Sequence, residues 1–192
     1  MSVPSTTPNP RAAVTFVGPM HYPATKNLRN LCSQLVATRT SELYLLFSST
    51  GGSLVEGFAL YNFLRALPMK LTIHNIGSVE SIANIVFLSA DRRFAAPETH
   101  FLFHGFDWSF SEKTTLVHER IKEISTSLSS DEDRFRSLFK QRSGLSEEKL
   151  KEMDFFRRSL VIKASEAQSL GLVHDVREAK ISEGWQVWNV DY

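Results

Sequence analysis

Three short segments of the sequence carry the residue types that acyl-transfer chemistry uses. They contain the glycine pair Gly51 and Gly52, the serine Ser81 within GSVESIAN, and the histidine His104 at the end of THFLFH. A serine hydroxyl becomes a nucleophile when a base takes its proton, and histidine is suited to that task near neutral pH. Adjacent glycines let backbone N–H groups approach an anion closely, as an oxyanion site requires. Together these residue types favour hydrolysis of a peptide or an ester.

Each segment, taken alone, also has an ordinary structural explanation. A serine at the start of a helix usually caps that helix, and either Ser78 or Ser81 fits this role. A Thr-Gly-Gly sequence after a strand is usually a turn. A histidine such as His104 is usually a hydrogen-bonded structural residue. The feature that the segments share is position, because each follows the end of a predicted strand.

The pattern of apolar residues predicts strands that alternate with helices. A nearly continuous apolar run, typical of a strand buried on both faces, occurs at 42–49, and a second strand is predicted at 70–77. Each precedes a segment with helical spacing. Residues 92–105 predict paired short strands around Pro97. This alternation implies an α/β fold with a largely parallel sheet, whose strands share an edge at their carboxyl ends. We therefore expect the glycine pair, the serine and the histidine to meet at that edge.

The length of the chain bounds its organisation. Its 192 residues are 42% hydrophobic, which predicts a single domain over 13–192. Residues 1–12 are rich in Pro, Ser and Thr and are expected to form a flexible arm. A long polar helix is predicted at about 111–142, longer than the body of such a domain needs. We expect it to project and pack against another subunit, with a helical hairpin on the sheet as the alternative.

Composition argues against several classes of partner and cofactor. The 22 basic and 21 acidic residues leave a formal net charge of +1, which gives no electrostatic reason to expect nucleic acid or an anionic membrane. The single Cys32 cannot form an internal disulfide, and the Cys and His residues lack the spacing of a zinc site. No apolar run in the sequence is long enough to span a membrane, and the N-terminus lacks the apolar stretch of a signal peptide. We expect a cytoplasmic protein without a metal or a cofactor.

The motifs around these residues resemble those of the ClpP family, the proteolytic subunits of the Clp serine peptidases. STGGS at 49–53 is similar to the family's Ser-Pro-Gly-Gly-Ser turn, and GSVESIA is similar to its Gly-x-Ala-Ala-Ser-Met-Gly nucleophile turn. The number of residues between the glycine pair and the serine matches the family pattern. FAAPETHFLFH and ASEAQSLGLVHDV resemble two further family segments. The likeness runs from about Thr15 to Val176.

The resemblance implies a fold and a set of site residues. The fold is the α/β arrangement of the ClpP/crotonase type, with repeated β-β-α units, a largely parallel core sheet and a projecting handle helix. Ser81 corresponds to the nucleophile and His104 to the general base. Gly51, Gly52 and Ile82 correspond to the oxyanion-hole residues, which contribute backbone N–H groups.

The resemblance also implies partners. The usual family assembly is a double heptamer that encloses the active sites, so we expect a homo-oligomeric ring that takes peptides or unfolded proteins as substrates. A Clp ATPase unfoldase is a further partner that the family implies. However, we expect the residues ahead of VTFVG to be too few to build the axial loops that usually meet it.

One departure from the family pattern concerns the third catalytic residue. The family places an aspartate shortly before the Ala-x-Glu-Ala helix, and counting back from ASEA reaches Ser159. Counting forward from RSGLSEEKL reaches Arg157 instead. Asp154 is the nearest carboxylate and is the candidate for this role. A second departure is Glu80, which stands beside Ser81 where the family has a small residue.

Three hypotheses of function follow from these residues. The first is an active ClpP-like serine peptidase that forms an acyl-enzyme on Ser81. The second is a catalytically weak or inactive ClpP-like subunit that serves assembly or regulation, which the missing aspartate favours. The third is an acyl-CoA enzyme of the related crotonase fold, which shares the amide oxyanion hole but does not call for Ser81 and His104 at these positions.

Overall fold

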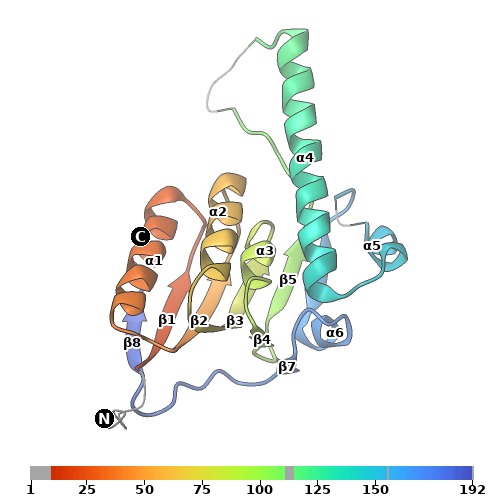
Figure 1. Cartoon of the computed structure of the whole chain (residues 1–192). Coiled ribbons are helices and arrows are strands. Elements are labelled where there is room, and N and C mark those ends of the chain that lie inside the picture. Colours follow the sequence, from red (N-terminus) through yellow and green to blue (C-terminus); the bar gives the residue numbers. More distant parts are fainter. Residues whose placement is uncertain (1–9, 111–114, 155, 192) are drawn as a thin grey trace, which may run out of the picture.

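The computed structural model describes residues 10–110, 115–154 and 156–191. The strands are β1 (Arg11–Val17), β2 (Glu42–Ser49), β3 (Lys70–Glu80), β4 (Arg92–Ala95), β5 (His100–Phe103), β6 (Leu160–Lys163), β7 (Asp175–Val176) and β8 (Gln186–Asn189). The helices are α1 (Tyr22–Ala37), α2 (Leu54–Arg65), α3 (Ala83–Phe87), α4 (His118–Ser143), α5 (Glu147–Met153) and α6 (Ala164–Ser169). The strands form one eight-stranded sheet in the order β6-β5-β3-β2-β1-β8, with β4 between β3 and β7 (Figure 1). The fold is therefore mixed α/β, as the sequence predicts.

The sheet is largely parallel, and β3 has two successive neighbours on one side. In the described residues only β5 and β6 pair antiparallel. Residues 72–75 of β3 pair with β4, whereas Ser78 pairs with His100 of β5. The register between β2 and β3 shifts between Phe47 and Ser49, just before the point where β5 joins. The strands β2, β3 and β5 therefore run in the same direction and end at the same edge of the sheet.

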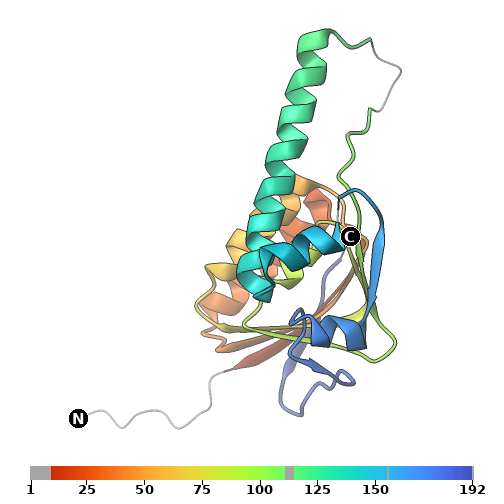
Figure 2. The same ribbon diagram turned by 90° about the vertical axis from the view of Figure 1, so that its right-hand side faces the viewer.

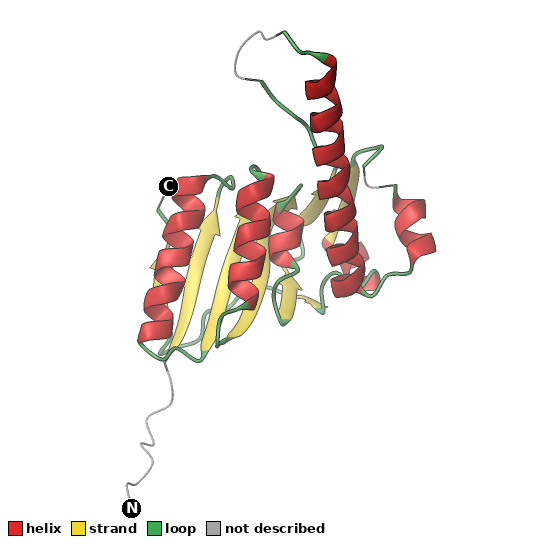
Figure 3. Ribbon diagram, turned by 45° about the horizontal axis from the view of Figure 1, so that its top comes forward, coloured by secondary structure: helices red, strands yellow, loops and turns green. Residues whose placement is uncertain are grey.

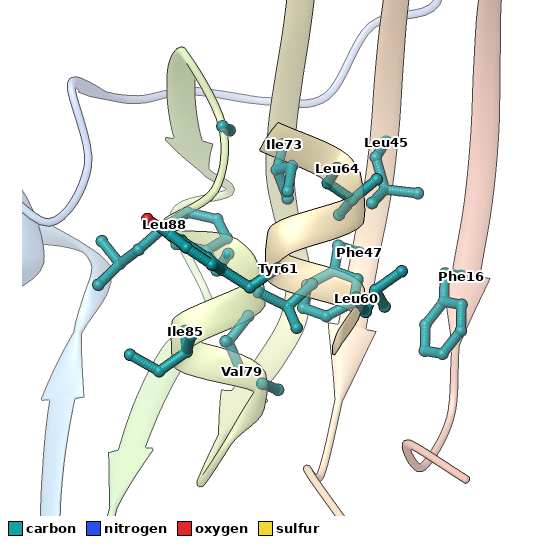
Figure 4. Packing of buried hydrophobic residues seen from close by; sticks show 14 of the residues in the cluster. Phe16, Leu45, Phe47, Leu60, Tyr61, Leu64, Ile73, Val79, Ile85 and Leu88 are labelled. Atoms are coloured by element: carbon teal, nitrogen blue, oxygen red, sulfur yellow. The ribbon is translucent and has the colours of Figure 1, made fainter. Parts of the chain in front are cut away.

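The helices α1, α2 and α3 lie on one face of the sheet, and the hydrophobic core fills the space beneath them (Figures 2 and 3). Phe16 and Phe47 extend from β1 and β2 into this core, with ring centroids 5.6 Å apart (Figure 4). Tyr44 and Leu46 alternate with the core residues of β2 and pack on the opposite face with Trp185. Burial on both faces explains why β2 reads as a nearly continuous apolar run.

The long helix α4 projects well beyond the body of the molecule (Figure 2). Only its C-terminal part is anchored, because Phe135 and Phe139 are its buried residues. Near its end the Arg142 guanidinium donates to the carbonyl oxygens of Leu88 at 2.9 Å and Ala90 at 2.8 Å. The sequence prediction of a projecting helix is confirmed. Its predicted start near residue 111 is not, because α4 begins at His118 and residues 111–114 lie outside the described part.

Two other details differ from the sequence prediction. The strands β4 and β5 flank Pro97 as predicted, but they do not pair with each other, because both pair with β3. Arg11 and Ala12 belong to β1 rather than to the predicted arm, whose residues 1–9 lie outside the described part. Among the described helices, none combines the length and the apolar character needed to cross a bilayer.

Candidate functional site

Ser81 occupies a strained turn between β3 and α3. It has a φ angle of 52°, in the left-handed region that costs a residue with a side chain about 1 to 3 kcal/mol. The helix α3 begins two positions later, and its N-cap is Ile82, without a side-chain capping hydrogen bond. Ser78 lies inside β3. Neither serine therefore caps the helix, and the ordinary structural explanation for Ser81 does not apply.

The backbone of Ser81 is held on both sides by hydrogen bonds. Its N–H donates to the Leu102 carbonyl oxygen of β5 at 2.9 Å. The buried amide of Asn84 donates to the carbonyl oxygens of Ser81 at 3.0 Å and Leu102 at 2.9 Å. Asn84 thus joins the serine turn to β5. The sequence analysis missed this residue, although a lone amide within the apolar segment SIANIVFLSA was an available signal.

The glycine turn that follows β2 lies directly against the serine turn. A Cβ atom added to Gly51 would lie 2.7 Å from the Ser81 Cβ and 2.8 Å from the Glu80 carbonyl oxygen. A Cβ atom added to Gly52 would overlap the Met20 carbonyl oxygen. Both positions therefore require glycine, and both also have positive φ angles.

Two backbone N–H groups at this junction have no acceptor within the described residues. They belong to Gly52 and Ile82, whereas the N–H of Gly51 donates to the Ser49 hydroxyl at 3.2 Å. Ile82 is fully buried, and the absence of a side chain at Gly57 of α2 accommodates it. Backbone N–H groups without an acceptor are the kind of donor that an oxyanion site uses.

His104 follows β5 and lines a small pocket together with Ser81. The rest of the lining consists of the phenylalanines Phe103, Phe106, Phe135 and Phe156. The Nδ1 atom of His104 lies 2.7 Å from the carbonyl oxygen of Gly105. In the described structure no hydrogen bond joins the Ser81 hydroxyl to the imidazole, and such contacts are often loose before substrate binds.

The aromatic residues of this pocket come from three separate segments. Phe106 lies 5.6 Å from Phe135 at the anchored end of α4 and 5.3 Å from Phe156 after α5, measured between ring centroids. Phe135 and Phe156 are themselves 5.5 Å apart. The edge-on geometry of these pairs is the arrangement that aromatic rings prefer. The base of the projecting helix therefore forms one wall of the pocket.

Asp154, the sequence candidate for the third catalytic residue, ends α5 in a left-handed conformation with a φ of 49°. Its carboxylate lies 3.8 Å from the Arg157 Nε. Within the described residues it makes no hydrogen bond or ion pair with His104. Ser159, the position reached by counting back from ASEA, is exposed just before β6.

The carboxylate of Glu80, the residue before Ser81, lies near a histidine other than His104. Its Oε1 lies 3.9 Å from Nε2 of His100, the first residue of β5. Among the described residues, no cluster of three or more His, Cys, Asp or Glu side chains is arranged to hold a metal ion.

Two further histidines have structural environments. His74 is buried, with Nδ1 2.6 Å from the Tyr44 hydroxyl and Nε2 2.9 Å from the Arg177 carbonyl oxygen, and burial lowers its pKa. Nδ1 of His174 accepts from the Arg93 N–H at 3.0 Å, and burial lowers the pKa of this histidine as well.

The family model described as Clp protease matches residues 18–180, well over half of the chain. The chain therefore belongs to the Clp protease family.

Individual relatives agree with this assignment, and a solved structure shares the fold. The chain is 27% identical over 154 residues to the ATP-dependent Clp protease proteolytic subunit 2 of Treponema denticola, which covers 79% of this chain and 74% of the relative. It is 28% identical over 142 residues to the ATP-dependent Clp protease proteolytic subunit 2 of Borreliella burgdorferi, which covers 72% of this chain and 68% of the relative. A mutant ClpP1 from Listeria monocytogenes has the same fold, with a TM-score of 0.76 at 18% identity over 88% of this chain and 92% of that one.

Proposed function

We propose that the protein is a serine peptidase in which Ser81 is the nucleophile and His104 the general base. The observation that carries this proposal is the convergence of three strand ends. The strained Ser81 turn touches the glycine turn after β2, and Ser81 shares a pocket with His104 after β5. A left-handed serine between a strand and a helix presents its hydroxyl in the manner of a nucleophile elbow.

The reaction would proceed through an acyl-enzyme. The Ser81 Oγ forms a bond to the substrate carbonyl carbon, and Nε2 of His104 accepts the hydroxyl proton. When the C–N bond of the substrate breaks, the same proton passes to the leaving amine. Water then attacks the ester, with His104 again serving first as base and then as acid.

The negative charge of the tetrahedral intermediate would be stabilised by the backbone. Gly52 and Ile82 have N–H groups without an acceptor among the described residues, which favours them as oxyanion donors. The Gly51 N–H already donates to Ser49 and would have to exchange that bond. Gly51 would then contribute chiefly because its lack of a side chain lets the glycine turn lie against the Ser81 turn. Removal of one such donor typically costs about 10²- to 10³-fold in turnover.

We also propose that the protein acts on peptides or unfolded proteins within a chamber made of several copies. Members of the Clp protease family form oligomeric rings and act on peptides. The projecting part of α4 and the segment before it expose apolar side chains, which a subunit contact would cover: Trp108, Phe110, Val117 and Ile121. A double heptamer, an ATPase partner and a cytoplasmic location stay predictions.

A second candidate function is a catalytically weak or inactive subunit. The observation that favours it concerns the third catalytic residue. Asp154 pairs with Arg157, and the position reached by counting back from ASEA is the exposed Ser159. Loss of the aspartate from a serine-protease triad typically reduces turnover by about 10⁴-fold, while residual catalysis remains.

A fluorophosphonate probe with mass spectrometry separates the two functions. We expect an adduct on Ser81 that is absent in Ser81→Ala and strongly reduced in His104→Ala. His100→Ala is the matched control, because His100 lies at the start of β5, four residues before His104, and outside the pocket, and it should leave the labelling rate unchanged. Absence of any adduct in folded, assembled protein would refute the peptidase and favour the inactive subunit.

A further inference from the structure

The orientation of His104 requires an acceptor for its Nδ1 proton, and the described part of the structure offers one that is not a side chain. We propose that the backbone carbonyl of Gly105 takes the place of the triad carboxylate and holds the imidazole with Nε2 as the basic nitrogen. This inference rests on the proposed function of Ser81 and His104 and identifies the positioning group of that site.

The tautomer follows from the chemistry of the contact. Nδ1 of His104 lies 2.7 Å from the Gly105 carbonyl oxygen, which is hydrogen-bonding distance. A carbonyl oxygen has no proton to give, so Nδ1 must be the donor. A neutral imidazole carries a single N–H, which leaves the lone pair on Nε2. That is the tautomer a general base needs, and in serine proteases an aspartate normally selects it.

The Gly105 carbonyl is itself held in place by close packing. A Cβ atom added to Gly105 would lie 2.7 Å from the Phe156 carbonyl oxygen, so only glycine fits where these two segments cross. The next residue, Phe106, packs its ring against Phe135 and Phe156. The peptide that carries the acceptor is therefore fixed between the end of β5, the base of α4 and the segment after α5.

The two carboxylates considered for the site have partners other than His104. Asp154 pairs with Arg157, and Glu80 lies next to His100. No ion pair joins His104 to an acidic residue within residues 10–110, 115–154 and 156–191. Among the described side chains and backbone groups, the imidazole has one hydrogen-bond partner, the carbonyl of Gly105.

The use of a backbone carbonyl in place of a carboxylate has a kinetic consequence. A neutral carbonyl fixes the tautomer and the ring orientation as a carboxylate does, because both accept the Nδ1 proton. It stabilises the imidazolium less, because hydrogen bonds to a charged acceptor are roughly twice as strong as those between neutral groups. The site should therefore react more slowly than one with a complete triad, yet independently of any acidic side chain.

The first test compares Asp154→Asn with wild type in the rate of Ser81 labelling by the fluorophosphonate. Asparagine keeps the size of the side chain and tolerates the left-handed backbone at this position. The matched control is Glu152→Gln on the same helix, where the carboxylate also forms a local ion pair, with Lys149 at 3.0 Å. We expect both variants to label within about threefold of wild type, as for the loss of an exposed ion pair. A fall of about 10⁴-fold in Asp154→Asn alone would overturn the inference, since it would make Asp154 the orienting group.

The second test reads the tautomer directly. Nitrogen NMR of histidine-labelled, assembled protein, with His104→Gln to assign the signal, should show a proton on Nδ1 of neutral His104. Gly105→Ala should shift the equilibrium between the two tautomers and slow labelling by about tenfold or more, because the contact with Phe156 displaces the carbonyl. A proton on Nε2 in the wild type would overturn the inference even if Ser81 reacts. A proton on Nδ1 without any labelling would instead refute the proposed function and leave the orientation supported.

Discussion

Replacement of Gly51 by alanine tests whether contact between the two turns sets the geometry of the site. Gly51 has a φ of 82°, and its added Cβ would overlap Ser81 and the Glu80 carbonyl at 2.7 and 2.8 Å. Gly184 has almost the same φ, 80°, but no described atom lies within 4 Å of its added Cβ. Gly184→Ala therefore measures the cost of the backbone conformation alone, about 1 to 3 kcal/mol. Gly51→Ala adds steric overlap with a buried backbone, typically about 1 to 3 kcal/mol more.

The assay is urea unfolding at one fixed protein concentration, since association of subunits would shift the apparent free energy of unfolding. We expect Gly51→Ala to lose more stability than Gly184→Ala by this steric cost. We also expect Ser81 labelling to fall by about 100-fold in Gly51→Ala, because a displacement near 1 Å at a catalytic group has that effect. Labelling in Gly184→Ala should not change. Equal losses of stability with labelling preserved in both variants would refute the argument that the glycine turn positions Ser81.

Three further predictions follow. Asn84→Ala should lower the free energy of unfolding by about 1 to 3 kcal/mol in urea titrations, because the carbonyls of Ser81 and Leu102 each lose a donor, and it should slow Ser81 labelling. Unchanged values for both would contradict the role of Asn84. The carboxylate of Glu56 accepts hydrogen bonds from the Thr25 hydroxyl and the Arg29 guanidinium, and these bonds lower its pKa, the Thr25 bond most. Glu56→Gln should therefore destabilise the protein near pH 7. That difference should vanish in thermal melts as the pH falls from about 4.3 through the lowered folded-state pKa, because the wild-type carboxylate becomes protonated there, and a pH-independent difference would argue against it. Burial raises the pKa of Cys32 to about 12, so thiol reagents should modify it only when the protein opens or unfolds. Rapid stoichiometric reaction in the native protein would contradict its burial.

The repeated alternation of strands and helices made most of the fold predictable from the sequence. The strand at 42–49 was predicted with its observed ends, because its apolar run is bounded by polar or glycine-rich segments. The short strand β6 at 160–163 was missed. It lies at the edge of the sheet and owes its conformation to antiparallel pairing with β5, which a local pattern cannot reveal.

The site was predictable only in part. Sequence spacing placed Gly51, Ser81 and His104 after parallel strands, and the structure shows these positions at one edge of the sheet. The interactions that hold them are harder to foresee, because the Gly105 acceptor is a backbone atom that every residue type possesses. The amide of Asn84 likewise gains its meaning only through contact with Leu102, a residue on another strand.

The pairing of β1 has a consequence for the order in which the chain folds during synthesis. One edge of β1 pairs with β2, but the other pairs with β8, where Ala12 lies opposite Gln186. At a typical elongation rate, roughly ten to thirty seconds separate the synthesis of these two strands. During that interval β1 presents an open row of backbone donors and acceptors to other nascent chains. The nascent protein should therefore be most prone to aggregation until its C-terminal strand emerges, and release of chains truncated before Gln186 should increase that tendency.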